Sequence, residues 1–367
     1  MSEHTDQPTF LTLFRRVAET LLIAFAGAFA LGFAGFPAGW LSGAIVAVSA
    51  AALYGRPMFL PGMLARITYV AMGISIGGTV TPETLDGMAT WPLSLALLAL
   101  SMALLTIAVT VYLQFVHKWD PGSALLGAFP GGLATVLVLA IENNADVRGV
   151  AVVQTVRVVA VAVLLPAAIG LFGLAAAPLP PRASDLGDPG QLAILVGVST
   201  MAAVAAQWVR LPGGLLFGAM LASAVLHGAG IVTITFPWWL TTAAFILLGA
   251  LTGTRFSNMD ARLLRHLAAA AVGALAVGLT VAFACAAAAA WALGLDQGPM
   301  MIAYAPGAID AMMVLAMALN YEPAFVGAHH LARFMLVIAT MLWIVALMRR
   351  LRRDVPQSGN DDGAKDG

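Results

Sequence analysis

The chain has 367 residues, of which 61% are hydrophobic and 10% are charged, and its formal net charge is zero. With a mean hydropathy of +0.93, it carries more apolar surface than one water-soluble core could bury, which excludes an ordinary soluble protein and predicts an all-α polytopic membrane protein in a lipid bilayer. The basic residues are scattered, so the composition also excludes a nucleic-acid-binding surface and direct contact with DNA.

Twelve apolar segments of helical length follow one another along the chain. They lie near residues 20–35, 38–54, 62–79, 90–116, 122–142, 148–175, 191–209, 213–230, 236–254, 266–293, 298–319 and 324–348. Prolines and carboxylates between the sixth and seventh segments cannot continue a lipid-facing helix. The predicted organisation is therefore a cytoplasmic N-terminal segment (1–19), a first membrane repeat (20–175), a linker (176–190), a second membrane repeat (191–348) and a cytoplasmic tail (349–367).

The two halves of the chain resemble each other in sequence. Setting Pro130 on Pro306, an offset of 176 residues, aligns AFPGGLATVLVLAIENNADVRGVAVVQTVRVV with YAPGAIDAMMVLAMALNYEPAFVGAHHLARFM. A match of this length predicts two homologous repeats. The pairs that coincide include Gly131/Gly307, Asn144/Asn320 and Arg157/Arg333.

The distribution of Lys and Arg predicts how the repeats cross the membrane. Every basic cluster falls on the cytoplasmic side if segments 122–142 and 298–319 each enter and leave on one side. This predicts about five spans plus one re-entrant or broken segment per repeat. The protein would lie in the bacterial inner membrane with both termini on the cytoplasmic side. Because five is odd, the second repeat is predicted to be inverted, as is typical of secondary transporters, although duplication can also serve only to build a stable bundle.

A Pro-Gly motif interrupts an apolar segment in each repeat. Pro130-Gly131-Gly132 and Pro306-Gly307 break the helix, and irregular backbone at membrane depth is tolerated only inside protein or beside a wet cavity. We therefore expect these motifs to line a cavity, with helix N-termini directed into it. The alternative is a kink that serves packing.

Arg157 and Arg333 are predicted to lie near the bilayer centre. Each is roughly 14 Å along its expected helix at about 1.5 Å per residue, and a charge at that depth needs a partner. The candidate partners are Glu142, Asp146, Asp310, Glu322 or an anionic solute. A purely structural salt bridge is the alternative.

Other polar residues accompany the two motifs. Asn144 and Asn320 are candidate cavity residues, and with the acidic pair Asp146 and Glu322 they are alternatively interpreted as caps of the helices that carry the arginines. Asp310 has no acidic counterpart in the first repeat, where Ala134 is aligned, and it is the predicted proton- or ion-coupling carboxylate unless it pairs with Arg333. His330 is interpreted as a polar lining residue or proton acceptor.

The remaining features indicate packing. Small-residue pairs one turn apart predict close helix seams, namely Gly39/Gly43, Gly73/Gly77, Gly214/Gly218 and Gly249/Gly253. Cys285 lies in an apolar run and is read as a packing residue. His329 and His330 are adjacent but point about 100° apart on one helix, and the other four histidines are scattered singly, so the sequence predicts neither a metal site nor a cofactor.

AFPGGLATV followed by QTVR, and AYAPGAIDAMM followed by HHLAR, make the chain resemble the AbrB-type membrane family, whose members carry an AbrB duplication domain. The resemblance covers about residues 20–348, and Ala308 stands where a second glycine is usual. Members are commonly labelled ammonia monooxygenases or regulators of gene expression. The residues support neither metal-dependent oxidation nor direct DNA binding.

These observations favour a secondary transporter or exporter of a small polar or anionic solute, and no enzymatic activity. The second hypothesis is a membrane regulator of gene expression that acts indirectly by sensing a ligand, and the third is a membrane oxidoreductase, which predicts bound metal. The sequence leaves a homo-oligomer open.

Overall fold

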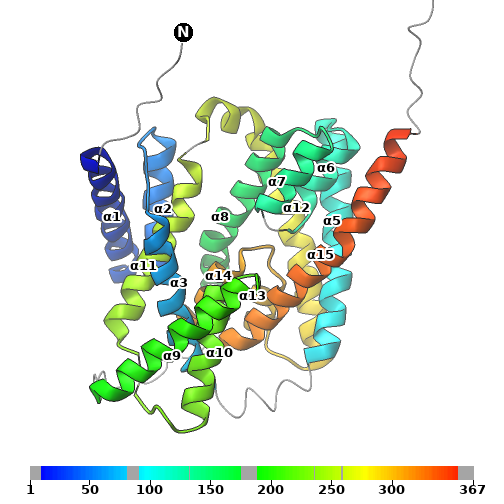
Figure 1. Cartoon of the computed structure of the whole chain (residues 1–367). Coiled ribbons are helices and arrows are strands. Elements are labelled where there is room, and N and C mark those ends of the chain that lie inside the picture. The colour runs from blue at the N-terminus through cyan, green and yellow to red at the C-terminus, as the bar shows by residue number, and fades with distance from the viewer. Residues whose placement is uncertain are drawn as a thin grey trace, which may run out of the picture.

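The computed structural model describes residues 10–80, 91–131, 133–174, 188–234, 236–257 and 259–353, and the regular structure throughout these ranges is helical, as predicted. Figure 1 shows the helices gathered in one bundle. Among the described residues, six helices are long and apolar enough to cross a membrane. They are α1 (Phe10–Phe33), α5 (Trp91–His117), α8 (Val147–Leu171), α9 (Pro189–Trp208), α11 (Trp238–Gly253) extended by η2 (Thr254–Phe256), and α12 (Ala261–Leu293).

The other helices are shorter, apart from the last. Helices α2 (Gly39–Leu53), α3 (Gly62–Gly77) and α10 (Gly214–Gly228) have 15 or 16 residues, and α15 (Pro323–Arg353) has 31. At about 1.5 Å per residue, the first three are shorter than a hydrocarbon core of about 30 Å. Each half of the described chain has five helices besides its Pro-Gly segment, and three helices in each half are long and apolar enough to cross a membrane, so the count of about five spans per repeat stays a prediction.

Both predicted Pro-Gly segments are broken helices. Segment 122–142 forms α6 (Pro121–Ala128) and α7 (Leu133–Glu142), and segment 298–319 forms α13 (Gln297–Tyr304) and α14 (Ile309–Ala318). Helices of 8 and 10 residues extend only roughly 12 and 15 Å, so none of the four crosses the membrane alone. Shifting the bounds of α6 and α7 by 176 gives the bounds of α13 and α14. In Figure 1, α6 and α7 lie together near one end of the bundle.

The helices pack in two groups, which we call the outer group and the broken-helix group. The outer group contains α1, α2, α3, α9, α10 and α11, and the broken-helix group contains α5, α6, α7, α8, α12, α13, α14 and α15. Figure 1 shows the outer group on the left and the broken-helix group on the right. They meet mainly where α2 contacts α8 and where α14 contacts α3 and α11.

All four predicted glycine seams are confirmed, and two of them join the halves of the chain. Gly43 of α2 abuts Gly27 of α1, and Gly218 of α10 abuts α9. Two further seams join helices from different halves, because Gly73 and Gly77 of α3 abut α10, whereas Gly249 and Gly253 of α11 abut α2. At each glycine an added Cβ would lie within 3.0 Å of a neighbouring atom, so the helices approach as closely as their backbones allow.

Gly73→Ala is expected to destabilise the protein by about 1–3 kcal/mol. The new Cβ would lie 2.4 Å from the Leu216 carbonyl oxygen, a backbone atom that cannot move without shifting α10. The measurement is the thermal unfolding midpoint in detergent. Gly197→Ala is the matched control, since a Cβ there meets nothing within 4 Å in the middle of α9. Equal midpoints for the two variants would contradict the close seam.

The first and the last described helices run past the limits predicted for the two membrane repeats. Helix α1 begins at Phe10, inside the segment predicted to be a polar extension, because residues 10–19 contain enough helix-forming apolar residues to continue the helix outward. Helix α15 runs to Arg353 and thus past residue 348. The start of α1 and the end of α15 lie at the same end of the bundle in Figure 1.

Candidate functional site

A tight turn at each proline separates the paired short helices. The Gly131 N–H donates to the Phe129 carbonyl at 2.9 Å, and the Gly307 N–H donates to the Ala305 carbonyl at 2.8 Å. These are three-residue turns centred on Pro130 and Pro306. Helices α7 and α14 begin directly after them, which confirms the predicted interruptions. Gly132, also predicted for the site, lies outside the described residues.

Arg157 of α8 is held by the backbone of the first turn. The side chain is buried, and its guanidinium donates to the Ala128 carbonyl at 3.2 Å and to the Phe129 carbonyl at 3.4 Å. It also donates to Gln154 Oε1 at 2.5 Å. Its Nε atom is buried without a hydrogen-bond partner.

Arg333 of α15 repeats this arrangement at the second turn. Its guanidinium donates to the Ala305 carbonyl at 2.5 Å and to the Gly307 carbonyl at 2.7 Å, and it contacts His330 Nδ1. Ala305 is the counterpart of Phe129 at the offset of 176. The side chain is buried to a similar extent as that of Arg157.

Neither buried arginine forms a salt bridge within the described part of the chain. The ion pair found there joins Arg56 to Glu19 at 2.8 Å. The predicted structural pairing of the arginines with Glu142, Asp146, Asp310 or Glu322 is therefore wrong. The physical reason is that the turns leave carbonyl groups without helical partners, and these oxygens accept from the guanidinium groups instead.

Gln154 and His330 occupy matching positions and make matching contacts. Gln154 Nε2 donates to the Leu126 carbonyl at 2.9 Å, while its Oε1 accepts from Arg157. His330 Nε2 lies 3.0 Å from the Ile302 carbonyl, while Nδ1 faces Arg333. Since a carbonyl only accepts and a guanidinium only donates, these contacts assign the hydrogen to Nε2 and leave the imidazole neutral. His330 thus acts as an amide-like bridge, which does not favour the predicted role as proton acceptor.

His330→Gln is accordingly expected to leave the thermal unfolding midpoint close to that of the unmodified protein. His330→Leu should lower the stability, at about 1–3 kcal/mol per buried polar group left unsatisfied, because the Ile302 carbonyl and Arg333 both lose a partner. Thermal unfolding in detergent measures both variants. Gln154→His is the reciprocal control, and a His330→Gln variant as unstable as His330→Leu would refute the bridging role.

The two turns face one cavity of about 680 Å³. We call Pro130, Gly131, Gln154 and Arg157 half-site 1, and Pro306, Gly307, His330 and Arg333 half-site 2; all eight residues line the cavity. The outer group closes the other side. Its lining residues are Arg66, Tyr69, Gln207, Pro212, Gly213, Leu215, Leu216 and Arg255 of η2. Since Arg66 and Gln207 are exposed whereas Arg157 and Arg333 are buried, the half-sites form the deep wall of the cavity.

Asp310 lies in the first turn of α14 and lines the same cavity. Its carboxylate lies near the Tyr69 hydroxyl of α3, and Arg255 of η2 lines the same cavity. Asp310 forms no ion pair within 4.0 Å in the described structure, so the predicted simple pairing with Arg333 is wrong. The carboxylate thus sits where the broken-helix group meets the outer group.

Asn144 and Asn320 lie away from the cavity. The φ angle is 49° at Asn144 and 59° at Asn320, which is the left-handed conformation that Asn tolerates. Asn144 therefore ends α7, and Asn320 ends α14. They do not begin α8 or α15, as the capping interpretation required. Asp146 does cap α8, since its carboxylate accepts from the Gly149 N–H at 3.0 Å.

Four polar lining residues escaped the sequence analysis, namely Arg66, Tyr69, Gln207 and Arg255. Arg66 and Arg255 belong to the basic clusters from which only the orientation of the chain was predicted. Gln154, which aligns with His330 at the offset of 176, was not predicted to line the cavity either. A signal existed for Gln154, since an amide one helical turn before a buried Arg is placed to share its hydrogen bonds.

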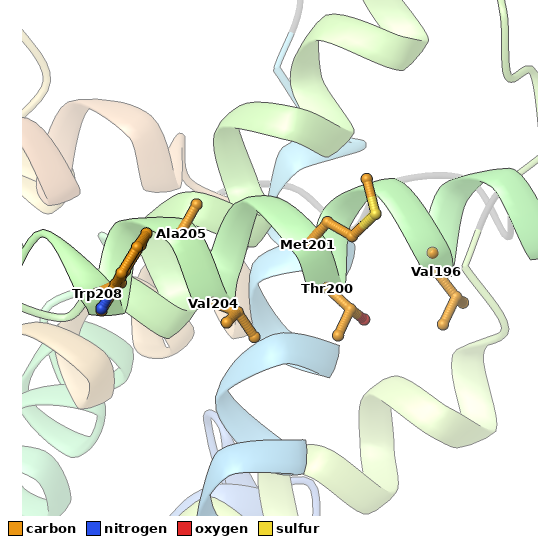
Figure 2. A pocket seen from close by; sticks show the side chains of 7 residues that line it. Val196, Thr200, Met201, Val204, Ala205 and Trp208 are labelled. Carbon is orange, nitrogen blue, oxygen red and sulfur yellow. The ribbon is translucent and has the colours of Figure 1, made fainter.

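A second hollow, on the exterior of α9, differs in chemistry. Figure 2 shows side chains of α9 that line it, and the polar groups among the labelled residues are the Thr200 hydroxyl and the Trp208 indole N–H. It contains no charged side chain. Among all described residues, moreover, no group of three or more His, Cys, Asp or Glu side chains lies together. The cavity that both proline turns line is the candidate site.

Comparison with known proteins identifies the family of the chain. The family described as "Transition state regulatory protein AbrB" matches residues 40–349. The chain belongs to the AbrB family. It is 29% identical over 318 residues to "Putative regulator AbrB" of Escherichia coli (strain K12), covering 83% of this chain and 88% of that protein. It is 26% identical over 358 residues to "Uncharacterized protein YhjN" of Bacillus subtilis (strain 168), covering 90% and 92%. The predicted family resemblance is thereby confirmed.

Proposed function

We propose that this AbrB-family protein is a secondary transporter or exporter of a small polar or anionic solute in the bacterial inner membrane. The observation that carries the proposal is the charged cavity between the two proline turns. Four arginines and one aspartate line it, and neither buried arginine has a carboxylate partner in the described structure. Buried charge is costly in a membrane protein and is characteristic of solute and ion pathways.

An inverted duplication is part of the proposal. The coincident bounds of α6 and α13, and of α7 and α14, support two related halves. The matching contacts of Arg157 and Arg333 with turn carbonyls support them as well. In Figure 1 helix α15 begins at the end of the bundle opposite to α6 and α7, which supports opposite orientations of the halves. Solute sites of inverted-repeat transporters lie between interrupted helices in this way.

The packing into two groups suggests how a solute would cross. The cavity lies between the outer group and the broken-helix group, and the two groups share few helix pairs. Rocking one group against the other would expose the half-sites alternately to each side of the membrane. Asp310 on one group faces Tyr69 on the other, so its protonation would alter the attraction between the groups and could couple the movement to protons.

Flux measurement in proteoliposomes tests the proposal. Purified full-length protein would be reconstituted, loaded with a labelled anion and exposed to unlabelled anion outside. Protein-dependent exchange that saturates with solute concentration is expected. Absence of exchange across carboxylates, amino acids and inorganic anions, with the protein folded and inserted, would refute transport.

A membrane regulator that senses a ligand is the second candidate, favoured by the name of the Escherichia coli relative. The cavity would then bind a ligand without moving it, and the C-terminal tail would relay the bound state to a partner. Deleting residues 354–367 separates the two candidates. Transport should survive the deletion, whereas lost regulation with unchanged ligand binding would support the relay.

We further propose that the protein is not an enzyme. The monooxygenase label used in the family requires bound copper or iron. Elemental analysis of the purified protein is the test, and stoichiometric metal retained through purification would overturn this part of the proposal.

A further inference from the structure

Resting on the proposed transport function, we infer that the solute is an organic dianion whose two carboxylate groups bind one to each half-site. The half-sites are equivalent in construction. Each presents a proline turn, the start of a helix and a buried arginine whose orientation is fixed by turn carbonyls. A ligand with one anionic group would engage only one of the two.

The charge of the cavity favours a dianion over a monoanion. Arg66, Arg157, Arg255 and Arg333 line it with Asp310 as the acidic lining residue, which gives a formal excess of three positive charges. Arg157 and Arg333 are moreover close enough for their like charges to interact unfavourably. A solute that carries negative charge at both ends would compensate both arginines at once.

The helix starts reinforce this selection. Ala308 precedes α14 without making a side-chain capping hydrogen bond, so the first N–H groups of that helix remain available to an anion. They lie next to Gly307, whose carbonyl orients Arg333. The backbone of half-site 2 and its arginine therefore favour the same kind of group, a carboxylate.

Size argues for an organic rather than an inorganic anion. A volume of about 680 Å³ falls within the range of roughly 300–1,000 Å³ typical of sites for organic molecules. Apolar walls formed by Leu133, Val158, Leu216 and Ile309 suit a hydrocarbon spacer between the two carboxylates. A zwitterion fits less well, because the four arginines that line the cavity repel its ammonium group and exceed the single negative charge of Asp310.

Calorimetric titration of the purified full chain tests the inference. The probes are succinate, glutarate and adipate, each beside its semi-amide and its monocarboxylate of equal length, with glycerol 3-phosphate and inorganic phosphate as anions carrying a single charged group. At least one dicarboxylate is expected to bind about tenfold or more tightly than its semi-amide. A semi-amide or a phosphate that binds as tightly as every dicarboxylate would overturn the inference.

Arginine variants assign the two groups to the half-sites. Arg157→Gln and Arg333→Gln should each reduce the affinity for the best dicarboxylate to about that of its semi-amide, while Arg148→Gln, an exposed change on α8, leaves it unchanged. Arg157→Lys provides a charged variant should Arg157→Gln fail to fold, and it should retain part of the preference. Unchanged dicarboxylate preference in folded Arg157→Gln and Arg333→Gln would also refute the inference.

The failure of the inference and the failure of the proposed transport function are distinguishable. Flux of a monoanion without any dicarboxylate preference would refute the dianion and leave transport standing. Absence of all flux and binding would refute transport itself.

Discussion

Arg333→Gln is expected to lower solute exchange in proteoliposomes at least about 30-fold. The substitution removes the positive charge of half-site 2 and the two hydrogen bonds that the guanidinium donates to the Ala305 and Gly307 carbonyls. Truncating one side of a buried, charged hydrogen-bonded contact costs about 2–5 kcal/mol, and every 1.4 kcal/mol corresponds to about a factor of ten. Arg157→Gln should behave similarly, because its guanidinium makes the corresponding contacts.

The variant that combines Arg157→Gln with Arg333→Gln tests whether both arginines act on the same solute. If both arginines act on one bound solute, their effects will not add, since either substitution alone already removes productive binding. Arg148→Gln is the matched control, because Arg148 lies on the same helix as Arg157 but is exposed. Monodisperse gel filtration and an unchanged helical circular dichroism spectrum must accompany each measurement. Near-normal exchange by folded Arg333→Gln would rule out a solute in this cavity.

The broken helices and their arginines could be predicted from the sequence because both follow from strong local rules. Proline and glycine end apolar helices, and a charged side chain in the middle of a long apolar helix has to face the protein interior. The duplication made the inference firmer, since the same residues recur at Pro130 and Pro306 and at Arg157 and Arg333.

The partners of the arginines could not be predicted, because main-chain carbonyls carry no signature in the sequence. The predicted partners were carboxylates, whereas Arg333 donates to the Ala305 and Gly307 carbonyls at the Pro306 turn. The contribution of the outer group was also missed. Arg66 and Arg255 reach the cavity only through the packing of α3 and η2 against the broken-helix group, which is a long-range property.

The prediction that Asn144 and Asn320 cap the arginine-bearing helices was wrong for a different reason. Asn is favoured both before the first turn of a helix and after the last turn, and at Asn144 and Asn320 two helices meet within a few residues. Composition alone does not say which of the two helices the residue serves. The positive φ at both positions decides for the preceding helix.

Asp310→Asn is expected to abolish solute accumulation driven by a pH gradient while leaving exchange of labelled for unlabelled solute within about threefold of the unmodified rate. The amide has nearly the same shape as the carboxylic acid but can neither release nor accept a proton at this position. Exchange without a gradient requires only the half-sites and the movement of the groups. Coupled accumulation additionally requires a group whose charge changes during the cycle, and His330 is held neutral by Ile302 and Arg333.

The charged and titratable groups that share the cavity with Asp310 make it the strongest remaining candidate. Tyr69 and Arg66 face it from α3, Arg255 from η2, and the two buried arginines from α8 and α15. An ionised Asp310 attracts Arg66 and Arg255 on the outer side of the cavity, whereas a protonated Asp310 does not. Binding of a proton together with an anion would therefore weaken the attraction between the two helix groups. Tyr69→Phe is the matched control, because it removes the facing hydroxyl and keeps the carboxylate, and accumulation should persist at an altered rate. Continued accumulation by Asp310→Asn at an imposed pH gradient would exclude this carboxylate from coupling and would direct attention to coupling by another ion.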